Sequence, residues 1–287
     1  MRLCRFGEDR LGLVEGTTLK DVTAALDVLP SWRYPLPPFD PLIANLDRVR
    51  AQVQEIAADC PPLPLDGLNL LSPVASPGKI VAAPVNYQKH LDEVRGDAEL
   101  HHGNEAHKAP IHAMGLFLKA TSSLVGAGQG VQVRQLDRRT DHEVELAFVI
   151  GKRADRVSAA EAMQYVAGYS IGLDITIRGS EDRSFRKSPD SYTVLGPWLV
   201  TADEIADPGA LDLSLTVNGE TRQNSNTRYL ILGVAKLIEW ASSFYTLHPG
   251  DVILTGTPEG VSPIVPGDRV VATIQSIGSM SVAISAL

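Results

Sequence analysis

Cysteine is nearly absent from this sequence. Cys4 and Cys60 are the only two in 287 residues, too few for a disulfide framework or a zinc site built from thiolates. No apolar run reaches the roughly 18 residues of a membrane span. Acidic residues interrupt the N-terminal segment where a secretory signal peptide has its apolar stretch. These absences favour a soluble, cytoplasmic protein with no membrane partner.

Runs of basic residues are also absent. The formal net charge is −8, so a surface that tracks nucleic-acid phosphates is not expected. The 24 glycines and 19 prolines follow no fixed period, which excludes a collagen-like chain and indicates many loops and short strands. We therefore expect no nucleic-acid partner.

Length and patterning predict two domains. A chain of 287 residues has room for one large domain and one small one, at roughly 100–200 residues for a typical domain. Residues 1–72 read as a small N-terminal α+β domain, with a hairpin between Met1–Phe6 and Leu11–Glu15 and a helix over Leu42–Ala58. Residues 73–287 form the main domain.

The main domain is predicted to be a β-rich, mixed α/β fold rather than a doubly wound sheet, because strand patterns outnumber helical ones. Two helices are predicted. Ser158 and Glu161 form a capping box that opens a helix over Ala159–Val166, and an apolar stripe marks a second helix over Tyr229–Phe244. The predicted strands are Val144–Ile150, Ser170–Thr176, Leu211–Val217, Val252–Thr255, Arg269–Gln275 and Ser281–Ile284.

Acidic residues enter two of these strands. Because side chains alternate along a strand, Glu143 and Glu145 point to one face, while Asp174 lies in an apolar stretch of the next strand. Three carboxylates from two strands suit a hard divalent cation and leave positions open for substrate. A solvated strand face that binds no metal has the same spacing, so both interpretations stay open at this point.

A G-x-S-x-G motif occurs at Gly168–Gly172. In a nucleophile elbow a strand precedes the serine and a helix follows it. Here the predicted helix precedes Ser170 and a β-branched run follows. A serine nucleophile is therefore disfavoured.

Four of the seven histidines, His101, His102, His107 and His112, lie in one polar segment. They could bind zinc, but no strand or helix pattern aligns them. A mobile, solvated loop is the favoured interpretation.

An acid–base pair precedes that segment. On a helix, His90 and Glu93 at positions i and i+3 lie on the same side, so the carboxylate could orient the imidazole and raise its basicity. A surface contact without function has the same spacing.

From about Lys79 to Leu287 the sequence resembles the fumarylacetoacetate hydrolase family. The resemblance rests on short blocks in a fixed order: Asn86-Tyr87 with His90 and Glu93; Phe117-Leu118-Lys119; Asp141-x-Glu143-x-Glu145; Gly168-Tyr169; Asp174-x-Thr176-x-Arg178; Lys187 with Asp190; Leu195-Gly196-Pro197-Trp198; Asn218-Gly219-Glu220 with Gln223; and Pro249-Gly250-Asp251 running into Thr255-Gly256-Thr257-Pro258.

This resemblance implies a β-sandwich roll, a homodimer, and Mg²⁺ or Mn²⁺ held by Glu143, Glu145 and Asp174. It implies that His90 and Glu93 are the acid–base pair, beside a lid over residues 92–113, and that Lys187 stabilises an oxyanion. The residues expected to bind substrate are Tyr87, Arg178, Gln223 and Thr257.

One block departs from the family pattern. Where an aromatic residue and Lys-Ser-Phe-Asp-Thr are usual, this chain has Phe185-Arg-Lys187-Ser-Pro189-Asp190-Ser. Lys187 is kept, but the proline stiffens the loop, so a reshaped pocket is expected.

The resemblance implies hydrolysis of a carbon–carbon bond in a 2,4-dioxo acid, an acylpyruvate such as maleylpyruvate or fumarylpyruvate from aromatic catabolism. The small-molecule products are pyruvate and a carboxylic acid. Oxaloacetate decarboxylation or dioate isomerisation at the same metal is the alternative. A non-catalytic ligand-binding protein is the least favoured reading, because every candidate metal and acid–base position is filled.

Overall fold

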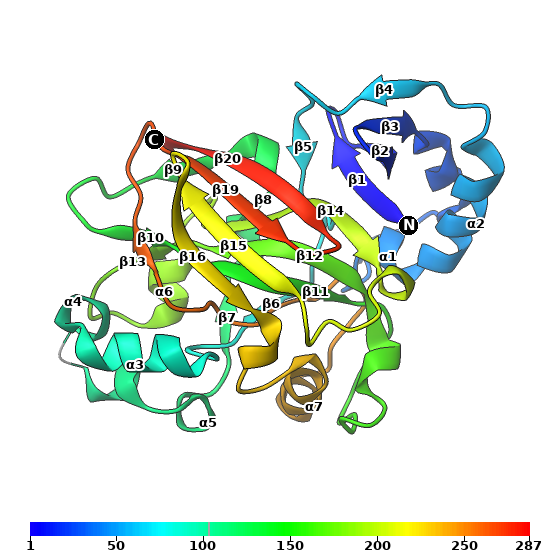
Figure 1. Ribbon diagram of the computed structural model, residues 1–287. Helices are drawn as coiled ribbons and strands as arrows, with labels where there is room; N and C mark the ends of the chain where they lie inside the picture. The colour runs from blue at the N-terminus through cyan, green and yellow to red at the C-terminus, as the bar shows by residue number, and fades with distance from the viewer. Residues whose placement is uncertain (103) are drawn as a thin grey trace.

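The computed structural model describes residues 1–102 and 104–287. Its strands form three sheets. Figure 1 shows the yellow to red strands of the five-stranded sheet in front of the strands β11 (Val144–Ile150), β12 (Val166–Asp174) and β14 (Thr193–Thr201). The twelve-stranded sheet contains β1 (Arg2–Phe6), β2 (Arg10–Glu15), β3 (Thr18–Asp21), β4 (Pro62–Pro64), β5 (Leu70–Leu71), β6 (Ile80–Ala82), β7 (Phe117–Lys119), β8 (Leu124–Val125), β11 (Val144–Ile150), β12 (Val166–Asp174), β14 (Thr193–Thr201) and β17 (Val252–Leu254).

Two smaller sheets complete the β-structure. The five-stranded sheet contains β9 (Val131–Val133), β15 (Asp212–Val217), β16 (Glu220–Asn226), β19 (Arg269–Ile274) and β20 (Gly278–Ala286). The three-stranded sheet contains β10 (Thr140–His142), β13 (Thr176–Ile177) and β18 (Ser262–Pro263).

Few helices accompany the strands, as the sequence predicts for a β-rich mixed fold. The α-helices are α1 (Pro41–Ala44), α2 (Leu46–Ile56), α3 (Gln88–Gly96), α4 (Ala98–His101), α5 (Ile111–Met114), α6 (Arg183–Lys187) and α7 (Val234–Phe244). Figure 1 shows α3, α4 and α5 together, away from the N-terminal strands. Among the described residues, no helix combines the length and apolarity needed to cross a membrane.

Strand β11 lies at the centre of the core. All seven of its residues are buried, and it pairs with β12 on one side and β17 on the other. Val144, Leu146 and Phe148 belong to one buried cluster, while Ala147 and Val149 belong to a second. This alternation is the predicted one, and it places Glu145 on the face opposite Val144 and Leu146.

The N-terminal strands extend the large sheet. Strand β1 pairs antiparallel with β14, with Leu3 opposite Leu199, and it forms the predicted hairpin with β2. Helix α2 packs on these strands through Val49 and Val53. The predicted helix over Leu42–Ala58 is confirmed with one break at Asn45, which separates α1 from α2.

The predicted helix over Ala159–Val166 is wrong. Only a short 3₁₀ turn, Ala162–Tyr165, forms there, and Val166 already belongs to β12. The Ser158 hydroxyl donates to the Glu161 side chain at 2.9 Å instead of capping backbone amides. Pairing of β12 with β14 then takes over the following residues.

The second predicted helix begins later than expected, at Val234 rather than Tyr229. Asn86 explains the difference. Its backbone carbonyl accepts from the Ile231 amide at 2.8 Å, and its side-chain oxygen accepts from the Leu232 amide at 2.8 Å. These bonds hold the segment in an extended conformation.

Ser170 lies inside β12, and its hydroxyl lies 3.0 Å from the carbonyl oxygens of both Gly196 and Trp198. The serine is fully buried, and strand rather than helix surrounds it. Its G-x-S-x-G motif is therefore structural, as the sequence context indicates.

We predict that Ser170→Ala lowers the free energy of unfolding by about 1–3 kcal/mol, because a buried hydrogen bond is lost and its acceptors are left unsatisfied. Urea denaturation measures this loss. Ser243→Ala, which removes an exposed hydroxyl on α7, is the control and should change little. Equal effects of the two substitutions would contradict the structural role.

Candidate metal and acid–base site

Three carboxylates meet where β10, β11 and β12 approach one another. Glu143 links β10 to β11, Glu145 is the second residue of β11, and Asp174 ends β12. The Asp174 amide donates to the Glu143 carbonyl at 3.0 Å, which places the two residues opposite each other. One carboxylate oxygen from each of the three residues lies within 4.8 Å of the others.

The arrangement fits a divalent cation. Oxygens bound to one cation at roughly 2.0–2.6 Å lie within about 4–5 Å of each other, which matches the 4.8 Å span of these atoms. The three residues are 1–4% exposed, which excludes the solvated strand face. An all-oxygen donor set favours Mg²⁺ or Mn²⁺ over softer metals.

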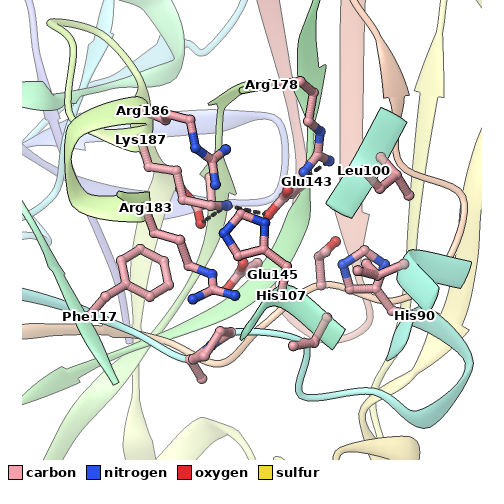
Figure 2. A pocket seen from close by; sticks show the side chains of 16 residues that line it. His90, Leu100, His107, Phe117, Glu143, Glu145, Arg178, Arg183, Arg186 and Lys187 are labelled. Carbon is pink, nitrogen blue, oxygen red and sulfur yellow. Dashed lines mark hydrogen bonds and ion pairs between the residues drawn. The ribbon is translucent and has the colours of Figure 1, made fainter. Parts of the chain in front are cut away.

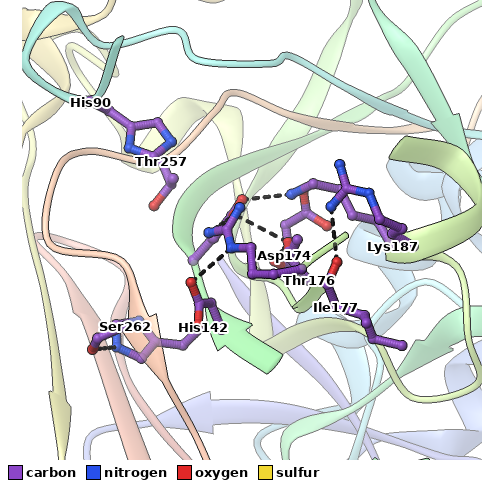
Figure 3. Close-up of polar contacts among 12 residues, drawn as sticks. His90, His142, Asp174, Thr176, Ile177, Lys187, Thr257 and Ser262 are labelled. Carbon is purple, nitrogen blue, oxygen red and sulfur yellow. Dashed lines mark hydrogen bonds and ion pairs between the residues drawn. The ribbon is translucent and has the colours of Figure 1, made fainter. Parts of the chain in front are cut away.

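Two buried lysines, Lys119 and Lys187, lie against the carboxylates, and Figure 3 shows Lys187 beside Asp174. The Lys187 ammonium donates to Glu143 Oε2 at 2.7 Å and to Asp174 Oδ2 at 2.6 Å. Lys119 donates to the other oxygen of Asp174 and, at 2.8 Å, to the Tyr192 carbonyl. Because an ammonium group has three hydrogens, Lys187 keeps one for a further acceptor.

The pKa values of Glu143 and Glu145 shift in opposite directions because their neighbours differ. Burial acts to raise the pKa of Glu143, but Lys187 and Arg178 outweigh it and lower that pKa to about 2. The pKa of Glu145 is raised well above its usual value by burial and by the carboxylates of Asp174 and Glu143. Glu145 forms no ion pair with the described residues, so a cation would complete its environment.

Glu145 is held by the backbone of the loop after β17. The Gly256 amide donates to Glu145 Oε2 at 2.5 Å. Gly256 has φ +94°, and a Cβ there would lie 2.7 Å from the Asn86 Cβ. This close approach requires glycine, and it explains the Asn86 and Gly256 blocks of the sequence.

The predicted acid–base pair forms on α3. His90 Nδ1 lies 2.8 Å from Glu93 Oε2, and the other Glu93 oxygen accepts from the Gly260 amide at 2.9 Å. His90 is 4% exposed. With Glu93 ionised, Nδ1 carries the hydrogen and Nε2 has a free lone pair. His90 and the three carboxylates line the same cavity (Figure 2).

The four residues predicted to bind substrate occupy different positions. Thr257 and Arg178 line the cavity, although Arg178 is also paired with Asp141 at 2.8 Å and Glu143 at 3.1 Å. Gln223 lies behind Thr257, to which its amide donates at 2.8 Å. Tyr87 is buried, and its hydroxyl has no hydrogen-bond partner in the part of the chain described.

The lid segment (residues 92–113) contains short helices, so the predicted solvated loop is wrong where it is described. Leu100 and Ile111 are buried, and His107 is 7% exposed and lines the cavity. These side chains give the segment a packed face. Its mobility stays a prediction. The histidines do not assemble a zinc site, because Glu143, Glu145 and Asp174 are the only cluster of candidate metal ligands among residues 1–102 and 104–287.

The predicted site residues do not include four basic side chains that line the cavity or contact one of its carboxylates. Arg183 and Arg186 of α6 and His107 line the cavity, and Lys119 contacts Asp174. Lys119 belongs to the Phe117-Leu118-Lys119 block of the family resemblance, and this block is the feature of the sequence that points to it. Arg186 lies in the block that departs from the family pattern and Arg183 lies two residues before it, where no signal distinguishes them.

The chain is similar to known proteins over its whole length. The family model described as "Fumarylacetoacetate (FAA) hydrolase C-terminal" matches residues 79–285. Maleylpyruvate hydrolase of Aquipseudomonas alcaligenes is 60% identical over 284 residues, 99% of each chain. The crystal structure of maleylpyruvate hydrolase from Sphingobium sp. SYK-6 covers 100% of both chains at 37% identity, with a TM-score of 0.85.

A second structure of the Sphingobium enzyme is in complex with manganese(II) ion and pyruvate. It is 37% identical, has a TM-score of 0.84, and covers 100% of this chain and 99% of that one.

We predict that Glu145→Gln weakens Mn²⁺ binding by more than tenfold, since losing a ligand costs more than the roughly 10–100-fold caused by losing a group behind the ligands. Isothermal titration of the metal-free protein measures the affinity. Glu220→Gln, an exposed substitution on β16, is the control. Unchanged Mn²⁺ affinity in Glu145→Gln would contradict the assignment.

Proposed function

Because the chain belongs to the fumarylacetoacetate hydrolase family, we propose that it is a divalent-metal-dependent hydrolase that cleaves maleylpyruvate or a close acylpyruvate to pyruvate and a carboxylic acid. The observation that carries this proposal is one cavity lined by both a carboxylate cluster and a His–Glu pair. A metal and pyruvate together in a relative's structure support it.

A bound divalent cation supplies Lewis acidity for the 2-oxo group and stabilises the negative charge of the departing pyruvate enolate. His90 Nε2 takes a proton from a water molecule, which attacks the 4-oxo carbon. Glu93 holds Nδ1 and stabilises the imidazolium that forms. The bond between C3 and C4 then breaks, its electron pair passes to the pyruvate enolate, and the acyl group becomes a carboxylic acid. The proton held by His90 passes to C3 of the enolate, which gives pyruvate, and the carboxylic acid ionises.

Lys187 faces the attacked carbonyl oxygen in this proposal. The Lys187 ammonium donates two of its hydrogens to Glu143 and Asp174, and these two bonds hold the ammonium in one position. The third hydrogen is donated to the oxyanion. Thr257 contacts the substrate carboxylate, and Gln223 positions the Thr257 hydroxyl. Arg178 orients the Glu143 carboxylate. The buried side chain of Tyr87 lies at the N-terminal end of α3.

The lid covers the reaction from solvent. The cavity measures about 50 Å³, space for a few water molecules at roughly 10–15 Å³ each. An acylpyruvate is much larger, so we propose that the lid, at its described residues 92–102 and 104–113, moves away for its entry and returns over it. Glu93 is the contact that releases on opening, because it bridges α3 to the Gly260 amide.

Hydrolysis is favoured over the decarboxylation of oxaloacetate and over dioate isomerisation, because neither alternative needs an activated water and the relative that is 60% identical is named a maleylpyruvate hydrolase. The family assignment also disfavours a non-catalytic binding protein. We propose a cytoplasmic homodimer with domains at residues 1–72 and 73–287, acting in aromatic catabolism.

We predict that His90→Ala lowers kcat for maleylpyruvate by roughly 10²–10⁴-fold, the usual contribution of general base catalysis, and leaves Mn²⁺ affinity unchanged. Steady-state kinetics and metal titration of the same preparation measure the two effects. Glu93→Gln should resemble it. If oxaloacetate decarboxylation, where detectable, falls as far as hydrolysis, His90 does not activate water.

Lys187→Met is expected to lower kcat by roughly 10²–10³-fold, the cost of losing one oxyanion donor. Mn²⁺ binding should be retained or tightened, because the lysine no longer competes for Glu143 and Asp174. The separate measurement of kcat and KM is decisive. A rise in KM with unchanged kcat would make Lys187 a binder of the substrate carboxylate instead.

A further inference from the structure

Two arginines of α6 line the cavity without forming an ion pair among the described residues. Arg186 is 4% exposed and donates only to backbone carbonyls, from Nε to Glu181 at 2.8 Å and from Nη1 to Ile177 at 2.9 Å. Arg183 donates to the Met114 sulfur at 2.8 Å. Neither guanidinium forms an ion pair with any residue of the described chain. Arg178, in contrast, is paired with two carboxylates.

The burial of two guanidinium groups that form no ion pair costs free energy. A cation removed from water requires a partner charge or hydrogen bonds that replace its hydration. Burial is the main reason that the pKa of Arg186 falls to about 10, which still leaves the group charged at neutral pH; Arg178 and Arg183 repel it, while Glu143 and Glu181 attract it from a distance. Free N–H groups remain on both guanidinium groups, in the fork geometry that fits a carboxylate.

His107 of the lid lies over the same end of the cavity and supplies no negative charge. Burial and the nearby Arg183 and Arg186 lower its pKa to about 4, so the imidazole is neutral at pH 7. Figure 2 shows Arg183, Arg186 and Lys187 approaching His107 from one side, and His90 on the other side. Glu143 attracts both guanidinium groups without an ion pair, so an anion that enters the cavity would be their first ion-pair partner among the described groups.

Resting on the proposed function, we propose that Arg183 and Arg186 bind the second carboxylate of the substrate, the one at the end of its acyl chain. The enzyme would then select acylpyruvates that are dicarboxylates. Lys187 belongs to the same helix as both arginines, so a group attached to the carbonyl that Lys187 contacts extends towards them. Maleylpyruvate carries such a carboxylate, and acetylpyruvate does not.

Binding of the carboxylate next to the 2-oxo group is the competing role for these arginines. The two roles give different substrate patterns. If the two arginines bind the carboxylate of the acyl chain, their substitution lowers activity only on dicarboxylic substrates. If they bind the carboxylate of the pyruvate end, their substitution lowers activity on every acylpyruvate equally.

The test measures kcat/KM for maleylpyruvate and for acetylpyruvate with the Mn²⁺-loaded enzyme and its Arg183→Gln and Arg186→Gln variants. We expect each variant to lose roughly 10- to 100-fold for maleylpyruvate, the effect of losing one charge-assisted hydrogen bond, and to keep its activity on acetylpyruvate. Arg134→Gln removes the same charge from an arginine paired with Asp190, and it should change neither substrate.

A second measurement does not depend on turnover. Calorimetric titration should show maleate binding to the native enzyme and at least tenfold weaker binding to Arg183→Gln, with pyruvate binding unchanged. Equal losses on both substrates, or unaltered maleate binding, would overturn the inference, and this holds even if Arg186→Gln fails to fold. No turnover of either substrate by the native enzyme would overturn the proposed function instead, while the maleate titration would still decide the role of Arg183.

Discussion

Repulsion among Glu143, Glu145 and Asp174 is the constraint on which the rest of the site depends. Three carboxylates buried within 4.8 Å of one another cannot all ionise unless positive charge lies between them. Lys187 and Lys119 supply part of it in the structure. The remaining demand, concentrated at Glu145, creates affinity for a divalent cation and, through that cation, for a 2-oxo acid.

The same constraint explains why distant blocks of the sequence meet here. The side-chain amide of Asn86 donates hydrogen bonds to the carbonyls of Leu232 and Thr255, both at 2.8 Å. These bonds join the start of α3 to the loop that holds Glu145. Gly260, whose backbone φ is +93°, approaches the Arg222 carbonyl too closely for any side chain, and its amide binds Glu93. The acid–base pair is thus fixed relative to the carboxylates through backbone contacts.

Sequence reasoning located the parts of the site that depend on local geometry. Alternation along β11 placed Glu145 away from the apolar face, and i, i+3 spacing paired His90 with Glu93. Residues whose position depends on tertiary packing had no such signal. Arg186 belongs to an atypical block and Arg183 lies just before it, and the predicted helix over 159–166 gave way to pairing of β12 with its neighbours.

The most direct test of the account is to follow the cleavage of maleylpyruvate in H₂¹⁸O, with Mn²⁺ and after chelation. Metal-dependent hydrolysis predicts one ¹⁸O atom in a carboxylate of the released maleate, because water attacks the acyl carbonyl. It also predicts that chelation of the metal abolishes the reaction. Release of carbon dioxide, maleate without the label, or undiminished cleavage by the chelated enzyme would contradict it.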